Sequence, residues 1–377
     1  MKKICVFPND PLKSYFKKGE IKPRYFNPKN IFDEVHVISL FDDDIEEEKV
    51  KTVAGDALFK IHVVGKVNLL NKNSKRKGII NLIKKINPHV LRSYNPLLQG
   101  WVATQVKKEL GIPLVISLHG DYDRDRRHFA KKNKDYKTYF KLLYSKRTLE
   151  PFSLKNADEV IIIYEFLREY AKKMGAKNIN LIHNRIDLSQ FMTKVKPAFK
   201  EEKPVIICVG RLIKEKNQEC IIQAIRDLDV ILVVVGDGVE YENLVKLTND
   251  LGIQDKVRFE RSIPHDRIQE YYAAADLFAL PIKYGGFAIP SIEAAASGLP
   301  VILPIQEFDS KPDIISEYAK MVENNPESFK KAISDVLSDS NLRSRLIENG
   351  LKISQQINSD IMEEKEKELY LNLFEKN

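Results

Sequence analysis

Three places in the sequence combine side chains that could do chemistry with the end of an apolar run typical of a β-strand. Arg211 and Lys216 follow the run VIICVG, and His119 follows LVISL. Glu293 lies in GGFAIPSIEAAASGLPV, after the run LFALP. Neighbouring cations bind phosphate or diphosphate groups, and a carboxylate accepts hydrogen bonds from a diol. These residue types favour the binding of a phosphorylated compound.

Each of these residues also has a structural interpretation. Arg211 and Lys216 could be solvated loop cations near Glu215, and His119 could be a structural histidine. Glu293 could favour the positive end of its helix, which contributes about 0.3–1 kcal/mol at an exposed site. The sequence leaves both interpretations open, although the small residues around Glu293 favour a ligand.

Two glycines, Gly236 and Gly238, follow the run VILVVV and flank Asp237. Glycine permits backbone conformations closed to other residues, so this spacing predicts a tight turn. The pattern is not GxGxxG, and no acidic residue ends a following strand in the arrangement that binds dinucleotides. A nicotinamide or flavin cofactor is therefore disfavoured.

Short β-rich runs alternate with helical stretches along the whole chain, which predicts parallel sheets with crossover helices. The charged, proline-containing segment 191–204 predicts a linker between two doubly wound domains. We expect domains at 1–195 and 196–354, with an amphipathic helix at 355–377. The predicted strands are KICVF, EVHVISL, HVLRSY, LVISLH and EVIIIY, then VIICVG, VILVVVG, KVRFE, LFALP and PVILP.

The composition is that of a globular protein of 377 residues with a formal net charge of +8. No apolar run approaches the roughly 20 residues that cross a bilayer, and no signal peptide is recognised, so we expect a cytoplasmic protein. The three cysteines lie in apolar runs without metal-site spacing. The positive charge favours an acidic partner, but no nucleic-acid-binding module accompanies it.

Taken together, VGRLIKEKN, VVGDG, KVRFERSIPHDRIQEYYAAADLFALP and GGFAIPSIEAAASGLPVI resemble the donor domain of retaining glycosyltransferases of family four. The resemblance is specific over about residues 204–303 and extends into the first half through NPHVLRSYNP and ISLHGD. It implies the GT-B fold, with two Rossmann-like domains facing a central cleft and a C-terminal helix that returns to the N-terminal domain. It also implies transfer of a sugar from a nucleoside diphosphate to an acceptor with retained anomeric configuration.

The resemblance implies a role for each matching residue. His119, Arg211 and Lys216 would be catalytic, the cations offsetting the charge on the leaving diphosphate, so no metal or other cofactor is required. The acceptor would meet Lys18, Gly19, Asp121 and Asn184. The donor would meet Gly210, Arg211, Lys216, Gly236, Gly238, Arg258, Gly285, Gly286, Phe287, Ala288, Ile289 and Glu293.

Two alternatives differ in class from this enzyme. The family pattern has a second glutamate where this chain has Gly285, which favours a sugar-nucleotide-binding partner or sensor protein without turnover. Asp42 and Asp44 form a DxD-like pair that could instead serve a metal-dependent transferase. The acidic residues that follow them are more typical of a solvated loop.

A basic and aromatic segment lies between Arg124 and Arg147, with Tyr136, Phe140 and Tyr144 among its cations. A second basic run extends from Lys72 to Lys85. A basic, aromatic, amphipathic helix is typical of an element at a membrane surface, although a solvated face over a core stripe has the same pattern. We therefore expect a carbohydrate or lipid-linked acceptor and peripheral association with an anionic membrane.

Overall fold

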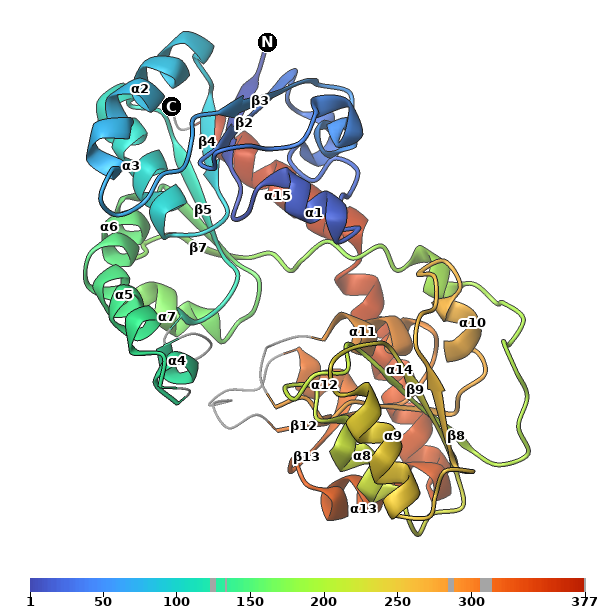
Figure 1. Ribbon diagram of the computed structural model, residues 1–377. Helices are drawn as coiled ribbons and strands as arrows, with labels where there is room; N and C mark the ends of the chain where they lie inside the picture. The colour runs from blue at the N-terminus through green and yellow to red at the C-terminus, as the bar shows by residue number, and fades with distance from the viewer. Residues whose placement is uncertain (123–126, 133, 284–287, 306–313, 376–377) are drawn as a thin grey trace. The chain divides into compact units, whose positions relative to one another are not determined.

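The computed structural model describes residues 1–122, 127–132, 134–283, 288–305 and 314–375. The chain folds into two compact units (Figure 1), the first made of Met1–Asn184 with Asp360–Asn377 and the second of Arg185–Ser359. Each unit contains one parallel sheet with helices on its faces.

The first unit is built on a seven-stranded sheet in the order β3-β2-β1-β4-β5-β6-β7, with every pair parallel. The inner strands β1, β2, β4, β5 and β6 are almost fully buried because helices cover both faces. Alternate side chains of β1 therefore enter two separate cores, Cys5 and Phe7 one, Ile4 and Val6 the other. The strands are β1 (Lys3–Phe7), β2 (Glu34–Ser39), β3 (Leu58–Val63), β4 (Val90–Ser93), β5 (Leu114–Leu118), β6 (Glu159–Ile162) and β7 (Ile179–Leu181).

Helices α2, α3 and α7 supply apolar side chains to the core that contains Cys5, and α1 and α15 supply them to the other. Three short 3-10 turns lie between β1 and β3. The helices of this unit are α1 (Leu12–Lys17), α2 (Lys72–Ile86), α3 (Leu98–Leu110), α4 (His128–Lys132), α5 (Tyr136–Arg147), α6 (Leu149–Asn156), α7 (Leu167–Lys173) and α15 (Ser359–Glu375).

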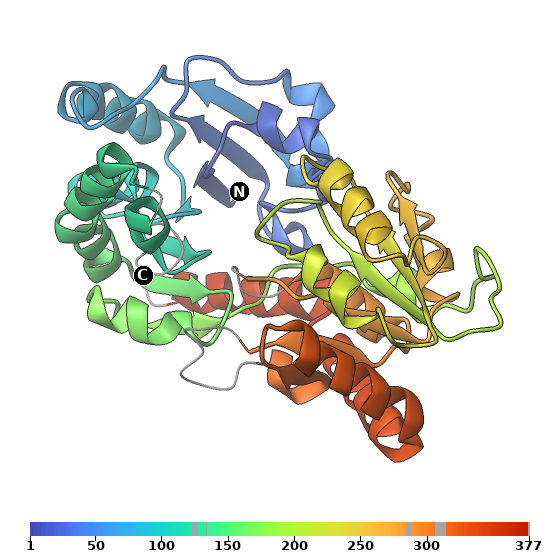
Figure 2. The same cartoon turned by 60° about the horizontal axis from the view of Figure 1, so that its bottom comes forward.

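The C-terminal helix α15 lies against the first unit's sheet, as the fold predicted from the sequence requires (Figures 1 and 2). Met362, Leu369 and Leu373 are buried in its core. Glu363 is 2% exposed and accepts hydrogen bonds from Arg24 Nε at 2.8 Å and Nη2 at 3.0 Å. A charged residue this deeply buried needs such partners, so this ion pair fixes where the helix lies.

The second unit has a six-stranded parallel sheet in the order β10-β9-β8-β11-β12-β13 around a single core. Its strands are β8 (Val205–Val209), β9 (Ile231–Val235), β10 (Val257–Glu260), β11 (Leu277–Ala279), β12 (Val301–Pro304) and β13 (Ala319–Val322). Its helices are α8 (Gln218–Ala224), α9 (Tyr241–Asp250), α10 (Ile268–Tyr272), α11 (Ile289–Ala296), α12 (Ile315–Tyr318), α13 (Pro326–Ser338) and α14 (Ser340–Gln356).

All ten predicted strands are present, and the predicted class of two Rossmann-like units is confirmed. The sequence missed β3, β7 and β13, and all three are edge strands. Their side chains are only partly buried, so they lack the continuous apolar runs of central strands.

The chain passes between the units after Asn184 and again after Ser359, whereas the sequence placed these boundaries after residues 195 and 354. The predicted linker packs onto the second unit, because Phe191 is 2% exposed in its core and the ring of Phe199 contacts Tyr271. Within the described residues, no helix combines the length and apolar content needed to span a bilayer.

Candidate functional site

Arg211 and Lys216 lie in the loop between β8 and α8, at the carboxyl end of a central strand. Lys216 is half-buried, and its alkyl chain lies beside Gly210. Burial, and secondly the charge of Arg211, lower the pKa of Lys216. Neither cation has an ion pair or a side-chain hydrogen bond with any residue that the structure describes. Two neighbouring cations without an acidic partner form a site for an anion.

Glycines at the end of β9 hold this loop in place. Gly210 N donates to Val235 O and Leu212 N donates to Asp237 O, both at 2.9 Å. A Cβ at Gly236 would collide with the carbonyl oxygen of Gly210, and one at Gly238 with that of Leu212. The two glycines are therefore required by a backbone-to-backbone contact between loops, in addition to the turn that the sequence predicted.

Glu293 is 5% exposed, and its charge has protein partners. Its Oε2 accepts a hydrogen bond from the Tyr272 hydroxyl at 3.1 Å, and its Oε1 lies 3.3 Å from His265 Nε2. Burial and the nearby carboxylate raise the pKa of Tyr272 well above its ordinary value, so its hydroxyl stays a donor. A carboxylate has about four acceptor positions, which leaves capacity for a ligand diol.

The sequence did not identify Tyr272 and His265 as partners of Glu293. Both lie in the quoted stretch IPHDRIQEYYAAAD, but a separation of 21 or 28 residues in the chain gives no sign of contact. Gln190 Nε2 lies 3.1 Å from His265 Nδ1, so the assigned arrangement has His265 donating from Nε2 to Glu293 and accepting at Nδ1.

The stretch before Glu293 is described in part. Gly285, Gly286 and Phe287 lie outside the described residues. Ala288 is buried and precedes α11, and Ile289 is the first residue of that helix and 39% exposed.

Arg258 does not join the cation pair. Its Nη2 donates to Glu201 Oε1 at 2.6 Å, and its guanidinium lies 4.8 Å from the ring centre of Phe199. The side chain is occupied by the segment that precedes β8. The sequence prediction of a donor contact at Arg258 is not supported by this placement.

His119 follows β5 in the first unit, as predicted, and its environment keeps the imidazole neutral. Burial and the charge of Arg92 lower its pKa from 6.5 to about 4. Its Nε2 is buried and has no hydrogen-bond partner among the described residues. An orphaned buried nitrogen is costly, so the atom is available to a ligand.

The predicted acceptor residues are separate features of the first unit. Lys18 and Gly19 are exposed at the end of α1, where the positive φ of 67° at Gly19 ends the helix. Asp121 is half-buried two residues after His119, and Asn184 is half-buried at the last residue before the second unit. Asp121 is near His119 in the chain, and Lys18 is adjacent to Gly19.

Asp42 and Asp44 accept hydrogen bonds from neighbouring segments of the first unit. Asp42 accepts from Lys66 N at 2.9 Å, and Asp44 accepts from Lys13 N at 2.9 Å and Ser39 Oγ at 2.7 Å. Both carboxylates thus satisfy the polar groups of nearby loops, which accounts for the DxD-like pair structurally.

The basic segment forms α4 and α5 and is anchored by a buried network. Arg127 donates to Glu150 Oε1 at 2.9 Å, to the Tyr170 hydroxyl at 3.0 Å and to the carbonyl of Leu142 in α5 at 3.2 Å. Arg124 lies outside the described residues. The network holds one face of α5 against the unit and leaves Tyr136, Phe140 and Tyr144 exposed on the other.

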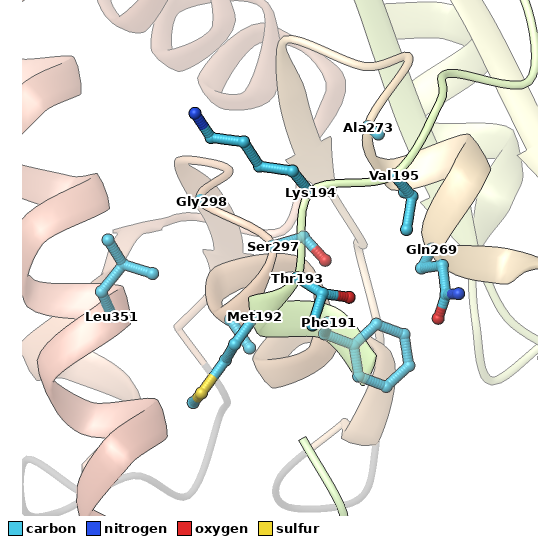
Figure 3. Close-up of a pocket in the computed structure, with 11 residues that line it drawn as sticks. Phe191, Met192, Thr193, Lys194, Val195, Gln269, Ala273, Ser297, Gly298 and Leu351 are labelled. Atoms are coloured by element: carbon cyan, nitrogen blue, oxygen red, sulfur yellow. The ribbon is translucent and has the colours of Figure 1, made fainter. Parts of the chain in front are cut away.

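A cavity of about 420 Å³ lies in the second unit beyond the end of α11 (Figure 3). Leu351 lies on one side, and Phe191 with Gln269 on the other. The ring of Phe191 also contacts those of His265 and Tyr272. Among the residues that the structure describes, none of the predicted donor residues lines the cavity, so Arg211, Lys216 and Glu293 are not part of its lining.

Gly236→Ala should disturb the cation loop. The added methyl group has to displace the backbone of Gly210, which should lower the free energy of unfolding by about 1–3 kcal/mol and weaken anion binding. Gly252→Ala is the control, because a Cβ there meets open space and only the positive φ of 66° is strained. Calorimetric unfolding and titration with a nucleoside diphosphate measure both effects. Equal results for the two variants would contradict the loop contact.

The low pKa of His119 should make the first unit less stable in acid. The unfolded chain binds a proton near pH 6.5 and the folded chain near pH 4, so stability is lost as pH falls through that window, by about 3 kcal/mol. His119→Gln should not show this loss of stability between pH 6.5 and pH 4. Denaturant unfolding followed by Trp101, the single tryptophan, reports the first unit. Parallel pH curves for the two proteins would show that His119 titrates normally.

Comparison with protein families identifies the chain. The family model Glycosyl transferases group 1 matches residues 190–353, and the model Glycosyltransferase Family 4 matches residues 33–190. The two models together span most of both units.

Curated relatives match part of the chain. A GDP-mannose-dependent alpha-(1-6)-phosphatidylinositol monomannoside mannosyltransferase of Mycolicibacterium smegmatis is 30% identical over 156 residues, which cover 37% of this chain and 40% of that protein. The lipopolysaccharide core biosynthesis glycosyltransferase LpsE of Rhizobium meliloti is 29% identical over 201 residues, which cover 52% and 58%. The matched part therefore spans about half the length of these relatives.

The fold also matches solved structures. HepE of Anabaena, in a complex with UDP, superimposes with a TM-score of 0.73 at 15% identity, over 99% of this chain and 100% of that chain. This likeness extends over both parallel sheets. From its two family matches and its GT-B fold, the chain belongs to the group 1, family 4 type of glycosyltransferases.

Proposed function

We propose that this protein transfers a hexosyl group from a nucleoside-diphosphate sugar to a glycan or lipid-linked acceptor, with retention and without a metal ion. The reaction would serve the synthesis of a cell-envelope polysaccharide or glycoconjugate. The single observation that carries the proposal is the pair Arg211 and Lys216, which has no acidic partner among the described residues.

The cation pair suits the departure of a diphosphate. When the bond between the sugar and the diphosphate breaks, negative charge grows on the leaving oxygen, and donors already fixed at that place stabilise it without reorganising. Bound diphosphate would also offset the burial and repulsion that lower the pKa of Lys216. Glu293 would bind the ribose hydroxyls while Tyr272 and His265 hold its carboxylate in place.

The relatives support the substrate classes. One is named for GDP-mannose and a phosphatidylinositol monomannoside, another for lipopolysaccharide core synthesis, and HepE was solved with UDP. The first name includes a nucleotide-sugar donor and a lipid acceptor, the second a lipopolysaccharide product, and the HepE complex a nucleoside diphosphate. Neutral His119, with its orphaned Nε2, would hydrogen-bond the transferred sugar.

We also propose that the protein works at the cytoplasmic face of the membrane through α5. Tyr136, Phe140 and Tyr144 recur every four residues, which places them on one helix face, and they are 56%, 63% and 44% exposed. Exposed cations without an ion pair to any described residue flank them, namely Lys131, Lys134, Lys137, Lys141 and Arg147. Exposed aromatic and basic side chains together fit an anionic lipid surface.

A partner or sensor protein without turnover is the second candidate, favoured by Gly285 in place of the family's glutamate. The two candidates share donor binding and differ in chemistry. Purified protein that transfers or slowly hydrolyses a sugar nucleotide excludes the second candidate. The anomeric configuration of the product, read by NMR, tests retention, and activity in a chelator tests metal independence.

Arg211→Ala with Lys216→Ala should abolish most donor binding. Loss of two charge-assisted contacts should weaken the affinity for UDP or GDP on the order of 100-fold, while the fold is kept because neither cation has a side-chain partner among the described residues. Lys203→Ala with Lys330→Ala is the matched control, since these cations of the same unit pair with Asp229 and Asp227. Calorimetric titration measures the affinities. If the Arg211→Ala, Lys216→Ala variant binds UDP or GDP as tightly as the parent, the proposal is wrong.

Lys137→Glu with Phe140→Ser should detach the protein from anionic vesicles. Each cation near such a surface contributes about 1 kcal/mol, so reversing one and removing an exposed ring should weaken binding to phosphatidylglycerol vesicles at least tenfold. Leu70→Ser is the control, because Leu70 is 96% exposed in the same unit but outside α5. Co-sedimentation at two salt concentrations measures the effect. Equal losses for both variants would remove α5 from the membrane proposal.

A further inference from the structure

Arg92 is a buried cation in the middle of the first unit's sheet. It lies on β4 and is 3% exposed. Among the described residues its ion pair is with Glu366 Oε1 of α15, 3.4 Å from its Nη2, and its Nε and Nη1 have no hydrogen-bond partner. Burying a charge with unfilled donors is costly. Fold stability alone therefore gives a poor reason for an arginine here.

Tyr94 connects this cation to His119. The Arg92 guanidinium lies 4.7 Å from the centre of the Tyr94 ring, and the imidazole of His119 stacks on the same ring at 5.8 Å between centres and an angle of 26°. Tyr25 also stacks on Tyr94, at 5.3 Å. The orphaned atoms of Arg92 and His119 thus belong to one packed group at the carboxyl ends of β4 and β5.

We infer that Arg92 is a positioning residue for His119: through Tyr94 and by its charge, balanced by Glu366 on the C-terminal helix, it holds the imidazole neutral and oriented. The role in sugar transfer rests on the proposed function, whereas the effect on the imidazole does not. The inference makes α15 part of the environment of His119, in addition to packing against the sheet.

The charges of Arg92 and Glu366 have opposite effects on the pKa of His119. Burial is the main cause of the low pKa of His119, Arg92 lowers it further, and Glu366 raises it. The other titratable groups of the cluster are phenols, Tyr25, Tyr94 and Tyr370, and burial raises the pKa of Tyr94, so that ring stays uncharged. Among the described residues, the charges that shift the pKa of His119 are those of Arg92 and Glu366.

A purely structural role for Arg92 makes a different prediction, because α15 has a separate anchor. Arg24 makes two hydrogen bonds to Glu363, one turn before Glu366, and its charge is not among those that shift the pKa of His119. If Arg92 only tied down the helix, Arg92 and Arg24 variants would behave alike. If Arg92 sets the state of His119, only the Arg92 variant changes its titration.

The test is an NMR titration of the His119 imidazole in the full chain without donor. Arg92→Met should raise the pKa of His119 from about 4 toward its ordinary value of 6.5, and Arg92→Lys, which keeps the charge, should leave it low. Glu366→Gln should lower it further. Arg24→Met is the matched control and should leave it unchanged.

A higher pKa of His119 in Arg92→Met and a lower one in Glu366→Gln support the inference. An unchanged pKa of His119 in either variant overturns it. Should Arg92→Met fail to fold, Arg92→Lys and Glu366→Gln still decide, since the inference requires an unchanged pKa in the first and a lower one in the second. In active protein, the acidic limb of kcat against pH should move as the NMR titration does. Failure of transfer with intact pKa shifts would count against the proposed function and leave the inference standing.

Discussion

Arg211 and Lys216 repel each other at the end of β8, and no carboxylate of the described residues neutralises them. Two like charges stay close together only where the surrounding backbone holds them. That backbone is the loop against which Gly236 and Gly238 close, with Val235 and Asp237 accepting hydrogen bonds from it. The pairing of β8 with β9 and the glycines that follow β9 allow this close contact between the two loops, and Lys216 is half-buried there.

Other buried charges of the described chain are paired. Glu293 has Tyr272 and His265, Glu363 has Arg24, and Glu150 has Arg127. In each case a desolvated charge is compensated by hydrogen bonds from elements distant in sequence. Against that background, cations without an acidic partner are most simply explained by a ligand that supplies the missing charge. The same reasoning applies to the orphaned atoms of His119 and Arg92 in the first unit.

The two units present different polar groups at the carboxyl ends of their strands. In both, polar groups lie after parallel strands, where a doubly wound sheet leaves room for ligands. The second unit offers positive charge from a loop fixed by glycine, and the first offers a neutral imidazole whose state depends on buried charge from β4 and α15. Because α15 follows the second unit in the chain and packs on the first, the end of the sequence contributes to the first unit's chemistry.

Much of the fold could be predicted because central parallel strands are covered on both faces and so are apolar throughout, as VIICV and VILVVV are. The edge strands β3, β7 and β13 escaped notice because partial burial leaves no such run. The predicted linker was placed wrongly for a similar reason, because the segment has no continuous apolar run. A single buried ring, Phe191, within this charged stretch packs it onto the second unit.

For the candidate site, the sequence was enough to identify residues that lie close together within one loop, such as Arg211 with Lys216 and the glycines that follow β9. Their spacing along the chain already places them together. Three pairings could be found only from the folded chain: Glu293 with Tyr272 and His265, Arg258 with Glu201, and Arg92 with Glu366 beside the group that contains His119. Such pairings join residues far apart in sequence, and which of them meet depends on how helices pack on the sheets.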